Sequence, residues 1–129
     1  MNGVLVLDTG ALIALSRRSP RVWELLDRAQ RSRADVLVPA GILVESLRGG
    51  PRDALINELL DEPHTRVTIH DQERARRAGR LLDSAGSSEV IDALVVAEAL
   101  RYDEVTVATS DPESIVNLVG IHDVTVVRV

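Results

Sequence analysis

The sequence contains no cysteine and no lysine, and both absences restrict its chemistry. Without cysteine, the chain forms no disulfide, has no thiolate nucleophile and builds no cysteine-ligated zinc site. All 15 basic residues are arginine, so any mechanism that needs a catalytic lysine is excluded. The only aromatic residues are Trp23 and Tyr102, too few for the base-stacking surfaces of common single-strand binders.

The exclusive use of arginine has two interpretations. A compositional bias of the genome explains it and also fits the abundance of Ala, Val and Asp. Alternatively, the planar guanidinium suits bidentate contacts with phosphate. The net charge of −5 argues against a long non-specific footprint on a nucleic-acid duplex.

The length of 129 residues and the hydrophobic fraction of 45% predict one domain, residues 1–129, with a single core. No apolar run is long enough to cross a bilayer, so no membrane association is expected. The first residues lead directly into an expected strand without a basic leader. We therefore expect a cytoplasmic protein.

Expected strands and helices alternate along the chain. Helix boundaries are marked by Ser19 with Pro20, by Asp71 and by Gly86. This alternation predicts an α/β fold with three layers, α/β/α, around a mostly parallel five-stranded sheet with right-handed crossovers. The expected strands span 3–8, 35–39, 66–70, 104–109 and 123–129, and the expected helices span 10–17, 20–33, 40–48, 51–62, from the Asp71 cap to 85, 89–102 and a short stretch after Pro112.

Two expected strands are followed by an aspartate, Asp8 in "VLVLDTGALIAL" and Asp111 in "VATSDPES". Ligands of open α/β sheets bind outside the carboxyl ends of the strands, where the winding direction reverses. If the winding reverses between these two strands, both carboxylates face one crevice. Each aspartate also has a structural explanation: Asp8 could cap the helix that follows it, and Ser110 to Glu113 has the spacing of a capping box.

The segment "EVIDALVVAEAL" predicts a helix that is apolar nearly all round and therefore has little water on any side. Asp92 interrupts that apolar surface. It is either a first-turn acid favoured by the helix dipole, with Ser87 or Ser88 as the cap, or a functional carboxylate. Glu89 lies on the same face and either joins Asp92 or only marks the start of the helix.

Glu45 in "AGILVESLRG" falls almost opposite Leu43 and Leu47, which mark the expected buried stripe of its helix. By periodicity alone it is a polar-face residue. His64, His70 and His122 have no ligand-like spacing and are interpreted as structural or surface residues.

Four segments taken together resemble the acidic blocks of PIN-domain ribonucleases: "VLVLDTGALIAL", "ILVESLRG", "VIDALVVAEAL" and "VATSDPES". The similarity is greatest to the small VapC-type toxins of bacterial and archaeal toxin–antitoxin pairs, and it covers essentially the whole chain. The resemblance implies a PIN-like domain whose catalytic, metal-binding acids fall on Asp8, Glu45, Asp92 and Asp111. The family often has another acid after the last block, and here Glu113 is the nearby candidate.

The resemblance also implies a function. Carboxylates without histidine or thiolate favour Mg²⁺, with Mn²⁺ as a substitute. The implied activity is metal-assisted hydrolysis of RNA, the implied partners are an RNA substrate and a cognate antitoxin, and a homodimer is expected. The apolar segment "VWELL" at 22–26 adds weak support for dimerisation, since we expect a domain this small to leave part of its apolar surface exposed.

Two other functions suit parts of the pattern. A phosphoacceptor receiver domain shares the acidic strand ends, but its chemistry normally needs a lysine, and its phosphatase-like relatives need a second aspartate where Gly10 stands. The remaining alternative is a non-catalytic PIN-fold module that binds RNA or a protein. The presence of all four acids favours the enzyme over this alternative.

Overall fold

The computed structural model describes residues 3–129, so residues 1 and 2 of the expected single domain lie outside the described residues. The described chain forms a five-stranded sheet in the order β3-β2-β1-β4-β5, and all four strand pairings are parallel. The predicted α/β fold is therefore confirmed, with a sheet that is parallel throughout. The strands are β1 (Val4–Leu7), β2 (Asp35–Pro39), β3 (Thr65–Thr68), β4 (Val105–Thr109) and β5 (Thr125–Arg128).

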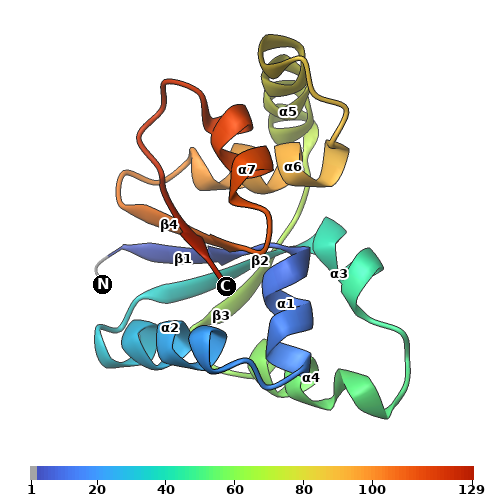
Figure 1. The fold of residues 1–129 in the computed structure, drawn as a ribbon, viewed down its shortest axis with the longest axis vertical. Helices are drawn as coiled ribbons and strands as arrows, with labels where there is room; N and C mark the ends of the chain where they lie inside the picture. Colours follow the sequence, from blue (N-terminus) through green and yellow to red (C-terminus); the bar gives the residue numbers. More distant parts are fainter. Residues whose placement is uncertain (1–2) are drawn as a thin grey trace.

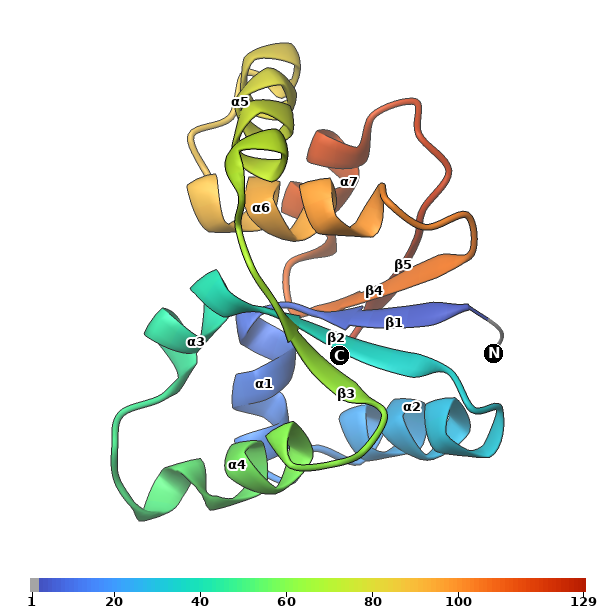
Figure 2. The ribbon, with the colours of Figure 1, turned by 180° about the vertical axis from the view of Figure 1, so that it is seen from behind.

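Helices cover both faces of the sheet, as Figures 1 and 2 show. Helices α1, α2 and α4 lie on one face and α5, α6 and α7 on the other, while α3 lies near the ends of the strands. Within residues 3–129, no helix is long and apolar enough to cross a membrane. The helices are α1 (Thr9–Ser16), α2 (Pro20–Arg31), α3 (Ala40–Ser46), the 3-10 turn η1 (Pro51–Asp53), α4 (Ala54–Leu60), α5 (Gln72–Ala85), α6 (Val90–Ala99) and α7 (Pro112–Val119).

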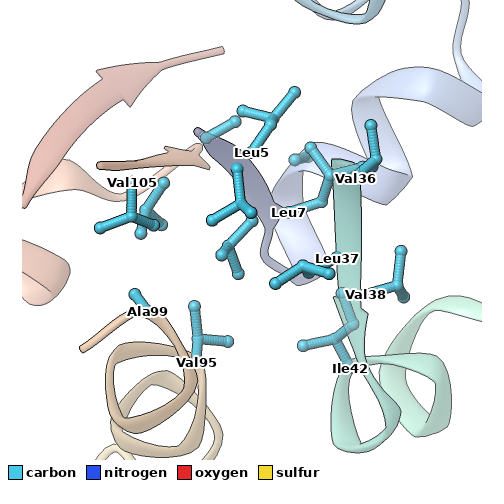
Figure 3. Close-up of a cluster of buried hydrophobic side chains, with 14 of the residues drawn as sticks. Leu5, Leu7, Val36, Leu37, Val38, Ile42, Val95, Ala99 and Val105 are labelled. Carbon is cyan, nitrogen blue, oxygen red and sulfur yellow. The ribbon is translucent and has the colours of Figure 1, made fainter. Parts of the chain in front are cut away.

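The core lies on both sides of β1, whose four residues are all buried. A strand covered on both faces needs no alternation of polar and apolar side chains, which explains the unbroken run in the sequence. Apolar side chains from the two neighbouring strands and from α3 and α6 meet those of β1 (Figure 3). The labelled members of this cluster are Leu5, Leu7, Val36, Leu37, Val38, Ile42, Val95, Ala99 and Val105.

The helix boundaries that the sequence marks at Ser19, Asp71 and Gly86 are confirmed. Asp71 caps α5 by accepting a hydrogen bond from the backbone N–H of Arg74 at 2.9 Å, and Gly86 ends the helix with φ of 62°. Ser19 precedes α2 with Pro20 in its first turn, although the serine side chain makes no capping hydrogen bond.

Four predicted helices are shorter than the sequence pattern suggested. The helix expected over 20–33 ends at Arg31, and the stretch expected over 51–62 consists of the 3-10 turn η1 and of α4, which ends at Leu60. The helix expected over 40–48 ends at Ser46, because Leu47 is extended and the Asp53 carboxylate accepts hydrogen bonds from the backbone N–H groups of Arg48 and Gly49. The helix expected over 89–102 ends at Ala99. The outer strands also differ at their ends, since β3 stops at Thr68 and β5 begins only at Thr125.

Candidate functional site

The four acidic residues Asp8, Glu45, Asp92 and Asp111, here called the acidic quartet, come from four different segments. Asp8 directly follows β1, and Asp111 comes two residues after the end of β4. These strands are neighbours at the point where the strand order reverses, which is the usual ligand position in open parallel sheets. Glu45 lies on α3, which follows β2, and Asp92 lies in the first turn of α6.

Asp8 is buried and caps α1. Its Oδ1 accepts a hydrogen bond from the backbone N–H of Ala11 at 2.9 Å, which confirms the capping interpretation. Burial raises the pKa of Asp8 from 3.8 to about 6, and the negative charge of Asp92 adds to the rise. The Thr109 hydroxyl and the Ala11 N–H favour the ionised form and lower the pKa in part. The residue is therefore a helix cap and also a carboxylate whose charge is only partly compensated.

Asp92 connects the quartet electrostatically. Burial raises the pKa of Asp92, and the charges of Asp111 and Glu45 raise it further. The Ser114 hydroxyl opposes this rise, donating a hydrogen bond of 2.6 Å to Oδ2 of Asp92. Since Asp92 also acts on Asp8, it interacts with all three other members.

Glu45 is exposed and is oriented by a residue of α1. The Thr9 hydroxyl donates a hydrogen bond to Oε1 of Glu45 at 2.6 Å, although 36 positions separate the two residues in the sequence. Because Thr9 directly follows Asp8, this hydrogen bond holds Glu45 next to the segment that carries Asp8.

The predicted buried stripe of α3 is wrong by one position. Ile42 and Ser46 are buried, whereas Leu43 and Leu47 are only partly covered and pack against the edge of the core. The reason is that Ile42 points into the apolar cluster next to β2 (Figure 3), so this side of α3 faces the core. Glu45 still lies on the exposed side, as expected.

Asp111 is exposed and caps α7. Its Oδ1 accepts a hydrogen bond of 3.3 Å from the Ser114 backbone N–H, and its own N–H donates to the Thr109 hydroxyl at 2.9 Å. The capping box predicted to start at Ser110 is therefore wrong, because the cap is the next residue along the chain.

The two additional acidic candidates lie outside the quartet. Glu113 is 84% exposed, and its Oε1 is paired with the Arg128 guanidinium at 3.4 Å. Glu89 is exposed and is the N-cap residue of α6, so neither Ser87 nor Ser88 has that position. The backbone N–H of Glu89 donates a hydrogen bond to the Ser87 hydroxyl at 3.1 Å.

Gly10 permits the close approach of α1 to the turn after β4. A Cβ at this position would lie 1.9 Å from the Ser110 hydroxyl oxygen and 2.6 Å from its Cβ. These distances are too short for any side chain unless the turn moves. The glycine therefore allows the segments that carry Asp8 and Asp111 to pack side by side.

The donor chemistry of the quartet fits a hard divalent cation. All its ligand atoms are carboxylate oxygens, and no ion pair of the described chain includes any of the four. Two of the carboxylates, Asp8 and Asp92, have a raised pKa, which means that their negative charge is unfavourable in the folded protein. A bound cation would remove this unfavourable energy. Within residues 3–129, no three acidic or histidine side chains are close enough to hold a metal ion in their present conformations. Binding would thus require rotation of some of these side chains.

A hollow of about 400 Å³ lies between α2 and the amino-terminal ends of β4 and β5. Its lining carries both signs of charge, with Arg21 and Arg28 beside Asp103 and Glu104. No member of the acidic quartet lines it, so it is separate from the candidate site.

One charged residue on α6 escaped the sequence analysis. Glu98 is fully buried, its carboxylate is paired with the Arg74 guanidinium of α5, and it accepts a hydrogen bond of 3.3 Å from the Tyr102 hydroxyl. Arg74 also contacts Asp71 at 2.8 Å. The signal was present in "VVAEAL", where a second acid interrupts the apolar helix just as Asp92 does.

Comparison with known proteins identifies the fold and the family. Three solved structures share the fold: FitAcB from Neisseria gonorrhoeae (24% identity, TM-score 0.65, covering 95% of this chain and 96% of that one), FitAB bound to an IR36 DNA fragment (21%, 0.66, 97% and 94%), and VapBC2 from Rickettsia felis bound to a DNA fragment from their promoter (13%, 0.66, 98% and 98%). A sequence search of curated proteins gives no significant match. The PIN domain family matches residues 5–117, a segment that contains all four acids. The chain belongs to the PIN domain family.

Proposed function

We propose that this protein is a divalent-metal-dependent ribonuclease and the toxin of a type II toxin–antitoxin pair. The observation that carries the proposal is the acidic quartet of a PIN domain, in which Asp92 interacts electrostatically with the other three carboxylates and none is paired with an arginine. A set of acids kept without counter-charges is costly to fold and is best explained by a cation that binds there.

In this proposal Asp8, Glu45, Asp92 and Asp111 hold Mg²⁺ or Mn²⁺. A bound divalent ion supplies Lewis acidity for the scissile phosphate and lowers the pKa of a bound water, so no covalent nucleophile is needed. Asp8 is the most rigid of the four, since it is buried and fixed as the cap of α1. Neutralisation by the cation would also keep its carboxylate ionised at a pH near its own pKa.

Two hydroxyl groups would orient the ligands. Thr9 holds Glu45 and Ser114 holds Asp92, each through a bond of 2.6 Å. Hydrogen bonds of this kind fix the direction of a ligating carboxylate and are usual around metal sites.

The net charge is compatible with an RNA substrate. Each divalent ion adds two positive charges, so two ions would change the formal charge from −5 to −1. Of the arginines near the ends of α1 and α3, Arg48 is directed to the carbonyl oxygens of Val44 and Leu47. Arg17 and Arg18 are exposed at the end of α1, and we assign none of these three to phosphate.

The toxin assignment is supported by the resemblance of the sequence to VapC-type toxins and by the shared fold of VapBC2 and FitAB. We further propose a homodimer that binds a small antitoxin, whose arginine or lysine would pair with the quartet. The segment 22–26 supports dimerisation less than expected, because Val22 and Leu25 are buried and Trp23, at 44%, is its only well-exposed apolar residue.

The proposal is tested with purified protein and single-stranded RNA, with and without Mn²⁺. The unmodified chain should cleave only with the metal, and Asp92→Asn, which keeps the volume but removes the charge, should not cleave. Asp103→Asn is the matched control, since Asp103 is exposed in the turn between α6 and β4. Metal-independent cleavage, or wild-type turnover by Asp92→Asn, would reject the mechanism. RNA binding without cleavage in any metal would favour the non-catalytic module.

The toxin assignment has its own test, which is co-expression with the neighbouring gene. A stable complex that no longer cleaves RNA is expected. Cleavage by the isolated chain without complex formation would leave a PIN-type nuclease and remove the toxin–antitoxin assignment.

A further inference from the structure

His70 makes a contact that the sequence analysis did not foresee. It follows β3, and its Nε2 accepts a hydrogen bond from the backbone N–H of Gly41 at 2.8 Å. Gly41 lies in the first turn of α3, where backbone N–H groups have no partner within the helix. The residue in the N-cap position is Pro39, whose side chain has no acceptor atom, so the capping acceptor comes from a segment 29 residues away.

The imidazole ring is seated directly against α3. A Cβ added to Gly41 would lie 3.0 Å from Nε2 of His70 and 3.4 Å from Cδ1 of Ile91, the residue that precedes Asp92. The start of α3, the start of α6 and the junction after β3 therefore meet at this glycine. Gly41 and Glu45 are four residues apart, which places them one helical turn apart on the same side of α3.

We propose that His70, as a neutral side chain, is a positioning residue for the acidic quartet, because it caps α3 and thereby sets the place of Glu45. The link to metal binding rests on the proposed function, whereas the capping contact does not depend on it. With only seven residues, α3 has few internal hydrogen bonds, so one bond at its start has a large effect on its order.

The contact requires one protonation state. Because Nε2 accepts from Gly41, the ring proton is on Nδ1, which is buried and has no hydrogen-bond partner within the described residues. A second proton would place a donor against the Gly41 N–H and a positive charge at the positive end of a helix. Protonation of His70 would therefore break the cap.

The surroundings of His70 contain charges of both signs. Burial lowers the pKa of His70, the Glu98 carboxylate of α6 raises it, and the Arg74 guanidinium of α5 lowers it. Arg74 is itself paired with Glu98 and Asp71. From α3 the imidazole meets the Gly41 N–H. The net pKa lies below the ordinary value of 6.5, so the ring is neutral at pH 7.5 and acidification releases the contact.

The contact is tested with two variants of His70 and a control. His70→Leu removes the acceptor, whereas the Oε1 of His70→Gln reaches the position of Nε2 and does not titrate. His122→Leu is the control, because His122 is exposed between α7 and β5. Hydrogen exchange at pH 7.5 should show the protection factor of the Gly41 amide falling about fivefold in His70→Leu, the effect of a typical N-cap. His70→Gln and His122→Leu should keep it.

Acidification separates the cap from simple packing. In the unmodified chain, the protection factor of the Gly41 amide should decrease as the pH is lowered below 6.5, while that of His70→Gln should stay constant. Wild-type protection in His70→Leu, or equal losses in His70→Gln and His70→Leu, would overturn the capping role.

Mn²⁺ affinity, measured by calorimetry, tests the step to Glu45. His70→Leu should weaken binding in the unmodified background but not in a Glu45→Gln background, because the two changes act through the same ligand. Equal weakening in both backgrounds would overturn the link to Glu45. If the unmodified chain binds no Mn²⁺, the proposed function and this link both fail, and the exchange result still decides the cap.

Discussion

Replacing Asp8 by asparagine should stabilise the metal-free protein at neutral pH. Folding raises the pKa of Asp8 from 3.8 to about 6, mainly through burial. The free energy of unfolding therefore falls as the pH rises from about 3.8 to about 6, because the carboxylate ionises less readily in the folded state than in the unfolded state. One pKa unit corresponds to about 1.36 kcal/mol, which makes the cost about 3 kcal/mol at most. Asparagine removes the charge and still accepts the hydrogen bond from Ala11, because it is as good an N-cap as aspartate.

The sign of this effect changes with pH in a defined way. The cost of the ionised carboxylate is absent below about pH 3.8 and fully present above about pH 6. The gain from Asp8→Asn should therefore be largest at pH 7 to 8 and vanish near pH 4. For a chain of this length, 1 kcal/mol is worth roughly 3 to 4 °C in melting temperature, so a rise of up to roughly 10 °C is expected.

Chemical denaturation and thermal melting at pH 4 and pH 7.5, in the presence of a chelator, measure the gain. Added Mn²⁺ should then offset most of this gain, since a ligand at 100 times its Kd stabilises the wild type by about 2.7 kcal/mol, whereas the variant lacks one metal-binding carboxylate and should gain less. Asp53→Asn is the matched control: Asp53 is equally buried, at 5%, but accepts backbone hydrogen bonds from Arg48 and Gly49. That substitution should lower the stability.

An unchanged or lower stability of Asp8→Asn at pH 7.5 would refute the reasoning. So would a gain of the same size at pH 4, because the stabilisation would then come from packing and not from charge. Equal melting shifts with Mn²⁺ in both proteins would show that Asp8 serves only as a helix cap.

Three further changes test the surroundings of the site. Ser114→Ala should raise the pKa of Asp92 further, because the hydroxyl donor favours its ionised form; a carboxyl NMR titration measures this, and an unchanged curve would contradict the contact. Gly10→Ala should lower the free energy of unfolding by about 1 to 3 kcal/mol, since the new Cβ collides with the turn after β4; an unchanged denaturation midpoint would show that the turn moves freely. Arg74→Met should cost about 3 to 5 kcal/mol by leaving Glu98 buried without its partner, and a loss below 1 kcal/mol would indicate that the ion pair contributes little.

The sequence by itself determined the layers of the fold and the positions of its elements. Unbroken apolar runs such as 4–7 are typical of strands covered on both faces, and the caps at Asp71 and Gly86 mark helix ends through local hydrogen bonds and backbone conformation. It also placed Asp8 and Asp111 after two expected strands, whose carboxylates would face one crevice if the winding reversed between those strands, and the order of the sheet has the reversal there. Local signals of this kind act over a few residues and can be read without a structure.

The tertiary structure alone decided which groups meet. Thr9 reaches Glu45 across 36 positions, Arg74 neutralises Glu98 across 24, and His70 caps α3 from 29 positions away. None of these contacts follows a period or a motif, because each depends on how separate helices pack on the sheet. The raised pKa of Asp8 has the same origin, since burial and the charge of Asp92 exist only in the folded chain.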